Sequence, residues 1–312
     1  MNQKVPRNMA ASVKSRLLQN ARRQGEEFQG VLTRYAIERF LYRLSRSPHR
    51  ESFVVKGANL FLLWMGAAHR PTRDLDLLGY GTQEVAAVVG VFQAICRQPV
   101  EDDGMTFDAE TVQGASVREN EKYAGLQITL SGGLGMAIIK LQVDIGFGDA
   151  VVPAAQEAVF PSMLGVPGAS LLTYPRETVV AEKCETMIDL GLGNSRLKDF
   201  YDLWHLASHF DFEGLLLCQA MSATFQRRGT TIAALPPPAL TGAFYGDAGR
   251  RRQWQAFLGK GGLSAASPAS LEECAHLLSA FLLPLLRATQ DRAPFHSRWR
   301  HTSLTWVEEE QV

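Results

Sequence analysis

Residues 53–81 place a short apolar run, a glycine turn, a second apolar stretch and a pair of acids in one unit. Residues 53–55 predict a buried strand, and residues 58–65 predict a helix after the turn. Asp74 and Asp76 lie in R-D-L-D-L-L, where acids alternate with leucines as in a half-buried strand. Side chains two residues apart on a strand leave from the same face. The two carboxylates are therefore predicted to point the same way.

A pair of carboxylates on one strand face favours a divalent cation. Their Cα atoms lie about 6–7 Å apart, so the like charges repel unless a cation bridges them. Mg²⁺ suits an all-oxygen site that a substrate phosphate completes, and Mn²⁺ takes the same ligands. The plainer interpretation is an exposed strand edge with two solvated acids, because D-x-D is a common tripeptide.

The turn upstream of the acids is suited to phosphate. Gly57 permits a tight turn between strand and helix, and the unpaired N–H groups of a helix N-terminus attract anions. The Walker pattern G-x-x-x-x-G-K-[ST] is absent. We place Gly57 and Asn59 among the nucleotide-binding candidates, together with Arg70, Thr72 and Arg73. An arginine in that position pairs either with a phosphate or with the acids themselves.

These motifs carry a family resemblance. The order of strand, K-G-small-polar, apolar helix and R-x-T-x-D-L-D resembles the AbiEii/AbiGii family of bacterial toxins, in the polymerase-β-like nucleotidyltransferase superfamily. The third carboxylate expected by the resemblance is Asp144, in the alternating segment 137–148. A later family element, A-E-K followed by R-x-K-D-x-Y-D-L, is matched at 181–183 and 196–203. The motifs cover residues 53–206.

The resemblance implies a fold and a domain plan. We expect an α+β protein with a polymerase-β-like core, a mixed sheet with flanking helices. Basic helices would occupy residues 1–50, the core residues 51–170, and a helical region that completes the active site residues 171–312.

The resemblance also implies an activity. An NTP would donate NMP to an acceptor, most often a tRNA 3′ end, in a toxin–antitoxin or abortive-infection system. Asp74, Asp76 and Asp144 would hold the metal ions, Lys183 would contact the phosphates, and Asp199 would orient Lys183 or close the site. An antitoxin would be encoded nearby, and in many such systems the two proteins need not bind each other.

One departure from the family affects the nucleotide. Many members carry Gly-Gly-Ser or Gly-Gly-Thr where this chain has Gly57, Ala58 and Asn59. The hydroxyl assigned to nucleotide contact is missing, although Asn59 both donates and accepts hydrogen bonds. The nucleotide preference of relatives therefore does not carry over, whereas the metal ligands are unaffected.

Lys183 and Asp199 have a second interpretation. Lys183 lies in a helix predicted to begin near Pro175, and Asn194 or Ser195 is suited to cap the next helix. On that second helix Arg196, Asp199 and Asp202 recur every three residues and share a face. The pair is either part of the site or a structural ion pair between packed helices, and Asp202 is the weaker candidate.

The bounds set by composition agree with a cytoplasmic enzyme. There is no N-terminal signal-like segment and no apolar run of eighteen residues, so neither secretion nor a membrane span is expected. The four cysteines are scattered without C-x-x-C, which argues against a zinc site and a disulfide framework. We interpret them as reduced, mostly buried thiols.

Charge is distributed unevenly. Residues 1–50 contain eleven Lys/Arg and three Asp/Glu, a surplus of eight, and the chain as a whole is neutral. The surplus is a candidate nucleic-acid contact. The alternative is that its arginines lie on the solvated faces of ordinary helices: Arg22, Arg23, Arg34, Arg39, Arg43, Arg46 and Arg50.

Other patterns predict the remaining elements. Residues 11–47 show two helical stretches that break near Gly25, and a helix is predicted over 82–97. A short strand near 105–108 and a hairpin of 123–131 with 136–146 follow, turning through the glycine-rich residues 132–135. We favour a hairpin turn over a phosphate loop there, because a strand follows it. Pro284 should kink or end the helix that begins near Ser270.

Two rival functions remain open. The first is a nucleotidyltransferase that modifies protein side chains. The second is a non-catalytic module that binds nucleotide or RNA, against which stands the presence of all three carboxylates.

Overall fold

The computed structural model describes residues 8–119, 123–261, 263 and 268–308. Its α-helices are α1 (Met9–Gln24), α2 (Phe28–Arg46), α3 (Asn59–Met65), α4 (Val85–Cys96), α5 (Arg176–Leu190), α6 (Leu197–His209), α7 (Gly214–Arg228), α8 (Gly242–Tyr245), α9 (Ala248–Gly261) and α10 (Leu271–Asp291). Its strands are β1 (Phe53–Lys56), β2 (Asp74–Gly79), β3 (Met105–Glu119), β4 (Tyr123–Leu134), β5 (Ala137–Phe147), β6 (Gln156–Val159), β7 (Ser170–Thr173), β8 (Phe212–Glu213), β9 (Ser297–Arg300) and β10 (Thr305–Glu308).

The chain forms two compact units. The first comprises Met1–Gly148 and Gln156–Thr173, and the second comprises Asp149–Ala155 and Tyr174–Val312. Each unit is described by itself below.

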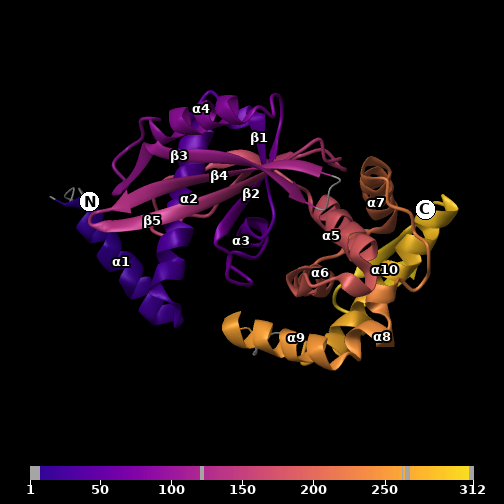
Figure 1. Cartoon of the computed structure of the whole chain (residues 1–312). Coiled ribbons are helices and arrows are strands. Elements are labelled where there is room, and N and C mark those ends of the chain that lie inside the picture. Colours follow the sequence, from indigo (N-terminus) through magenta and orange to yellow (C-terminus); the bar gives the residue numbers. More distant parts are fainter. Residues whose placement is uncertain (1–7, 120–122, 262, 264–267, 309–312) are drawn as a thin grey trace. The chain divides into compact units, whose positions relative to one another are not determined.

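The first unit is built on a seven-stranded mixed sheet in the order β3-β4-β5-β2-β1-β7-β6 (Figure 1). β2 runs parallel to β5 and β1 runs parallel to β7, whereas the other neighbours are antiparallel. The long strands β3, β4 and β5 lie side by side, and β2 continues the sheet from β5 (Figure 1). The two strands that carry the predicted acids are therefore adjacent.

Helices α2 and α4 cover one face of this sheet. Phe40 of α2 stacks on Phe92 of α4, with ring centroids 5.6 Å apart, and meets the edge of Phe107 of β3. Phe92 also meets the edge of Phe53 in β1. Offset and edge-to-face pairs of this kind add to the free energy gained from burial. This cluster fixes the two helices on the apolar face of the sheet.

The other face of the central strands is polar. Along β2 the buried Leu75 and Leu77 alternate with the half-buried Asp74 and Asp76. Strand β5 alternates in the same way, with Leu141, Val143 and Ile145 buried and with Gln142 and Asp144 half-buried. Successive side chains on a strand point to opposite faces. The acids therefore lie on the face opposite to α2 and α4.

Two arginines of the basic segment are buried in the first unit. Arg39 is 1% exposed and Arg43 is 5% exposed. Arg43 donates to both carboxylate oxygens of Asp103, at 2.8 and 3.1 Å, and Arg39 donates to the carbonyl of Pro167 at 2.8 Å. Of the two interpretations of the basic residues, neither a nucleic-acid contact nor a solvated helix face holds for Arg39 and Arg43. The helical pattern did not reveal them, because Asp103 lies sixty residues after Arg43 and Pro167 lies 128 residues after Arg39.

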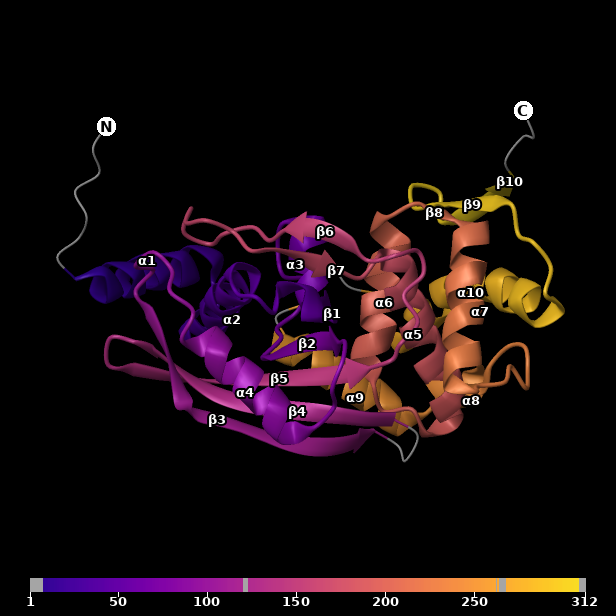
Figure 2. The ribbon, with the colours of Figure 1, turned by 90° about the horizontal axis from the view of Figure 1, so that it is seen from above.

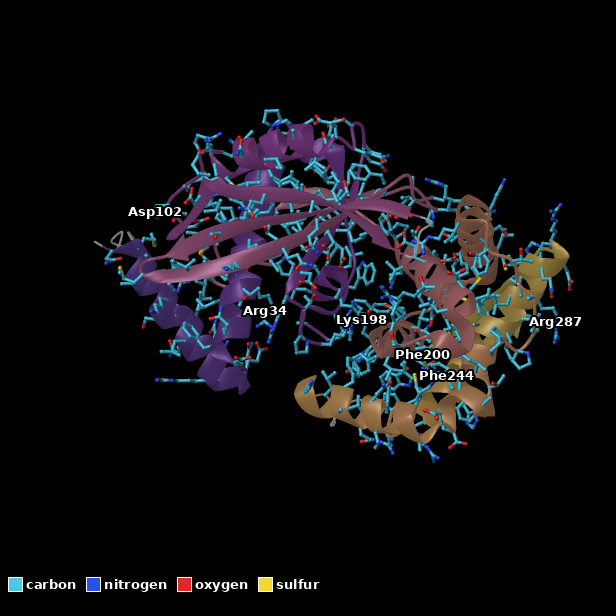
Figure 3. The ribbon with its side chains drawn as sticks, viewed as in Figure 1. Arg34, Asp102, Lys198, Phe200, Phe244 and Arg287 are labelled. Atoms are coloured by element: carbon cyan, nitrogen blue, oxygen red, sulfur yellow. The ribbon has the colours of Figure 1, made fainter. Side chains whose placement is uncertain are left out.

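In the second unit α5, α6, α7 and α10 pack together (Figure 2). Phe200 of α6 stacks on Phe244 of α8, with ring centroids 5.1 Å apart and planes 10° from parallel (Figure 3). A three-stranded sheet in the order β10-β9-β8 completes the unit. Trp299 of β9 is fully buried, and its indole N–H donates to the carbonyl of Ala207 at 2.7 Å.

The structure corrects three details of the expected elements. Strand β3 extends to Glu119, because its register with β4 continues past an irregularity between Asp108 and Gln113. Gly132 and Gly133 pair within the β4–β5 ladder, so the turn is shorter than expected. Helix α10 continues past Pro284, so the part of the expectation in which this proline ends the helix was wrong. The tertiary packing of α10, which buries most of its apolar residues, outweighs the hydrogen bond that proline removes.

Candidate active site

The predicted acids of the first unit belong to a row of residues that crosses four strands. Lys56 of β1 is the Cα partner of Asp76 in β2, Asp76 is the partner of Asp144 in β5, and Asp144 is the partner of Gln127 in β4. Asp74 begins the next row, opposite Gln142 of β5. Partners in register point to the same face of a sheet. Asp74 and Asp76 therefore share one face, as the alternation of the sequence predicts, and register places Asp144 on the same face.

Gly57 makes room for the carboxylate of Asp76. A Cβ atom on Gly57 would stand 2.0 Å from Oδ2 of Asp76 and 2.7 Å from its Cγ. The backbone of Gly57 also has φ of 74°, in the left-handed region where a side chain is strained. Glycine is thus required here for two reasons, the turn and the carboxylate that lies against it.

Two polar residues, Asn59 and Thr72, fix the loop between α3 and β2. Asn59 is 6% exposed, and its side-chain amide donates to the carbonyl of Asp74 at 3.0 Å. The hydroxyl of Thr72 donates to the same carbonyl at 3.4 Å, and Nη1 of Arg70 lies 3.5 Å from the carbonyl of Pro71. Asn59 and Thr72 thus tie the turn and the loop to the first residue of the acidic strand. Arg73, in contrast, is exposed.

The carboxylate of Asp144 accepts hydrogen bonds from two glutamine side chains. Nε2 of Gln127 donates to Oδ1 at 3.0 Å. Nε2 of Gln142 lies 3.2 Å from Oδ1 and 3.0 Å from Oδ2. Both donors are neutral amides, so they orient the carboxylate without cancelling its charge.

The donor set of the first unit fits a hard divalent cation. Three carboxylates from two adjacent parallel strands supply oxygen ligands only, which Mg²⁺ and Mn²⁺ prefer. The space at Gly57 leaves Asp76 room beside the turn. Within the described residues no three acidic, histidine or cysteine side chains already surround a common point at metal-ligand distance. The shared face and the register are what support the site.

In the second unit Lys183 of α5 is held between two carboxylates of α6. Its Nζ lies 2.7 Å from Oδ1 of Asp199 and 2.8 Å from Oδ2 of Asp202. Asp199 also accepts from Nε of Arg196 at 2.7 Å. Asp199 is 2% exposed and Asp202 is fully buried, whereas the Lys183 side chain is 13% exposed. Asp202, the weaker candidate by sequence, binds the lysine as closely as Asp199 does.

The charges around Asp199 decide its protonation. Burial acts to raise the pKa of Asp199, but the neighbouring Lys183 and Arg196 outweigh it and hold that pKa below its ordinary value. Asp199 is therefore ionised at neutral pH. Lys183 and Arg196 thus pair with the carboxylates of Asp199 and Asp202.

The local structure around this cluster follows from its sequence. Helix α5 begins after Pro175 and ends at Gly191, as expected. The side chain of Asn194 then accepts from the backbone N–H of Arg196 at 2.7 Å, at the start of α6. Because α5 and α6 pack against each other, Lys183 meets one face of the following helix.

The sequence pointed to most of these residues and missed three. Lys56, Gln127 and Gln142 were not among the candidates. Gln142 precedes Asp144 by two residues and so shares its strand face, a signal that sequence alone contains. Gln127 and Lys56 are neighbours of the acids only through strand register. The roles assigned to the candidates stay predictions.

Comparison with known families identifies the class of the protein, the nucleotidyl transferases. The model of the AbiEii nucleotidyl transferase toxins of type IV toxin–antitoxin systems matches residues 39–275. The chain belongs to this family. The family resemblance and the α+β fold expected from the sequence are thereby confirmed.

Solved structures give a more distant comparison. The chain is similar to the crystal structure of JHP933 from Helicobacter pylori, with 13% identity and a TM-score of 0.43, covering 85% of this chain and 95% of that one. A second structure from H. pylori, with a provisional assignment as a nucleotidyltransferase, has the same identity and TM-score and covers 85% and 96%. No curated protein matches the chain.

Two further findings bear on the expectations from composition. All four cysteines are free and buried, as expected. Among the described residues, none of the helices combines the length and the apolar character that a membrane span requires.

Proposed function

We propose that this toxin-family protein is a metal-dependent nucleotidyltransferase that moves NMP from an NTP to an acceptor, a tRNA 3′ end. The observation that carries the proposal is the acidic face, where Asp74, Asp76 and Asp144 lie on adjacent strands in register. A strand edge with two solvated acids does not account for a third acid placed opposite Asp76. Nor does it account for the absence of a side chain at Gly57.

The reaction requires an oxygen nucleophile, a polarised α-phosphate and a stabilised leaving group. The acceptor hydroxyl attacks the α-phosphorus and loses its proton, while the bond from that phosphorus to the bridging oxygen breaks and pyrophosphate leaves. Mg²⁺ or Mn²⁺, when bound, supplies Lewis acidity at the phosphate and at the attacking hydroxyl. Asp74 and Asp76 would hold the ions, and Asp144 would ligate on the side of the hydroxyl and receive its proton.

The remaining candidates would bind the triphosphate. Gly57 and the turn that follows it present backbone N–H groups, and Arg70 or Arg73 supplies a cation that pairs with phosphate oxygens. Lys183 would contact the phosphates as a point charge, with Asp199 and Asp202 directing it. Asn59 and Thr72 would act by holding the loop that carries Asp74.

The cellular role follows from the family. Members are toxins of toxin–antitoxin systems. Addition of a nucleotide to a tRNA 3′ end would block translation, which would serve abortive infection in the cytoplasm. The partners are then NTP, tRNA and an antitoxin encoded nearby, which need not bind the toxin directly.

Labelled nucleotide tests the proposal. Purified protein is incubated with Mg²⁺, total tRNA and each α-³²P-labelled NTP in turn, beside the variant Asp74→Ala/Asp76→Ala. We expect label on tRNA with one or more NTPs, and none with the variant. Label on polypeptide would indicate a protein-modifying enzyme. The absence of any label, with nucleotide binding intact, would indicate a non-catalytic binding module.

A further inference from the structure

The environment of Asp144 differs from that of two buried acids, Asp103 and Asp199. Asp103 and Asp199 are each bound by cations, Arg43 and Lys183 respectively. The hydrogen bonds to the Asp144 side chain come from the amides of Gln127 and Gln142. A cation at this position would neutralise the carboxylate and compete with a metal ion, whereas an amide leaves the charge in place.

We propose that Gln127 and Gln142 are positioning residues that hold the Asp144 carboxylate in the orientation that the proposed reaction requires. The inference rests on the proposed function, because it concerns the third carboxylate of the same site. The glutamines approach from two strands. Gln127 is the Cα partner of Asp144 on β4, and Gln142 lies two residues away on β5 itself. Donors from two directions restrict rotation of the carboxylate more than either one could.

The hydrogen bonds from the two glutamines leave lone pairs on the Asp144 carboxylate for a further ligand. A carboxylate offers about four lone-pair sites on its two oxygens. Gln127 uses Oδ1, and Gln142 lies within hydrogen-bond distance of both oxygens. Lone pairs remain for a cation or for the proton of an attacking hydroxyl. Replacement of a group that orients a metal ligand in this way commonly lowers metal affinity or activity about 10–100-fold.

The sheet provides a matched control. Gln113 of β3 is the partner of Thr129 on β4, and Thr129 is the partner of Gln142 on β5. Gln113 therefore lies on the same face as the two positioning residues, and it is exposed. Replacement of glutamine by methionine keeps the length of the side chain and removes the amide donor. The same substitution at all three positions separates the loss of a donor to Asp144 from a general effect on the sheet.

The first measurement is a titration of the protein with Mn²⁺ alone, in which electron paramagnetic resonance detects the binding of the ion. We expect Gln142→Met and Gln127→Met each to weaken binding about tenfold, while Gln113→Met stays at the wild-type value. Thermal unfolding of all three variants is measured in parallel, and an unchanged midpoint excludes a merely structural effect. In the transfer assay, the turnover number of the two variants should fall while KM for the NTP stays constant, because Asp144 acts on the side of the acceptor.

The outcomes separate this inference from the proposed function. If Asp144→Asn loses Mn²⁺ affinity and the Gln127 and Gln142 variants do not, the positioning role is overturned and the metal site stands. Equal loss in Gln113→Met would also overturn it. If the wild-type protein binds no Mn²⁺, the proposed metal-dependent function fails, and the positioning role fails with it.

Discussion

The carboxylate of Asp76 occupies the place where any residue other than glycine at position 57 would carry its Cβ atom, 2.0 Å from Oδ2. The turn and the acid are therefore one structural unit, although the two residues lie nineteen positions apart along the chain. A methyl group at position 57 has to displace the acid or the turn.

Gly57→Ala should therefore impair transfer beyond any effect on folding. A displacement of about 1 Å at a reacting group costs on the order of 10²-fold in rate, and we expect at least that loss in the labelled-nucleotide assay. Gly66→Ala is the matched control, because Gly66 has φ of 72° and no atom within 4 Å of the added Cβ. Both variants bear the strain of a left-handed alanine, about 1–2 kcal/mol. Equal activity of the two variants would contradict the link between Gly57 and Asp76.

Asp76→Asn should abolish growth inhibition when the protein is expressed without an antitoxin. The substitution keeps the size of the side chain and removes the charge that a divalent cation requires. Asp102→Asn is the control, since Asp102 is exposed and its Oδ1 accepts from the N–H of Gly104, which asparagine also permits. Toxicity that survives Asp76→Asn at equal expression would refute the enzymatic interpretation.

Lys183→Met should destabilise the second unit strongly. It leaves Asp199 and Asp202 without the ammonium that neutralises both, and breaking a buried ion pair in this way costs about 3–5 kcal/mol. Urea unfolding followed by tryptophan fluorescence is a suitable measurement, because four of the five tryptophans lie in that unit. Lys198→Met, at an exposed position on α6 (Figure 3), should change the unfolding free energy by less than about 0.5 kcal/mol.

Acid should weaken the second unit partly through Asp199. Because the folded-state pKa of Asp199 lies below its ordinary value, its contribution to stability is present at neutral pH and above. The contribution declines as pH falls below about 4, the ordinary pKa of an aspartate. The urea midpoint should thus fall more steeply in acid for the wild type than for Asp199→Asn. If the urea midpoints of the two proteins fall equally with pH, the ionisation of Asp199 does not contribute to the acid sensitivity of the second unit.

The basic segment should contact RNA through its exposed arginines. Arg22 and Arg23, in the last turn of α1, are exposed, so Arg22→Glu/Arg23→Glu should weaken tRNA binding and reduce its salt dependence. Arg251→Glu/Arg252→Glu makes the same change of charge at adjacent exposed residues of α9 and serves as the control. Filter binding across a salt series measures both. Unchanged binding by the first variant would leave only the solvated-helix interpretation of Arg22 and Arg23.

The buried arginines show where a count of charges misleads. Eleven basic residues precede position 51, yet Arg39 and Arg43 are buried and make their contacts inside the first unit. Arg34 pairs with Glu26 at 2.5 Å, and Arg50 pairs with Glu157 at 2.6 Å. The surplus available to a nucleic acid is smaller than the sequence indicates.

The sequence by itself determined the local features of this protein. Alternation in R-D-L-D-L-L placed Asp74 and Asp76 on one strand face, and the same alternation placed Asp144 in β5. Gly25, Pro175 and Gly191 marked helix ends, because their backbone preferences act within a turn of the chain. Motif order also led to the family that the comparison confirmed.

Only the tertiary structure decided which distant residues meet. Register across β1, β2, β5 and β4 set Lys56, Asp76, Asp144 and Gln127 in one row, and register depends on pairing between segments far apart in sequence. Packing of α5 on α6 made Asp202 an equal partner of Lys183. Local propensity acts over a few residues, whereas hydrogen-bonded ladders and buried ion pairs arise from the whole packed unit. For that reason the acids could be found from the sequence, and the groups that hold them could not.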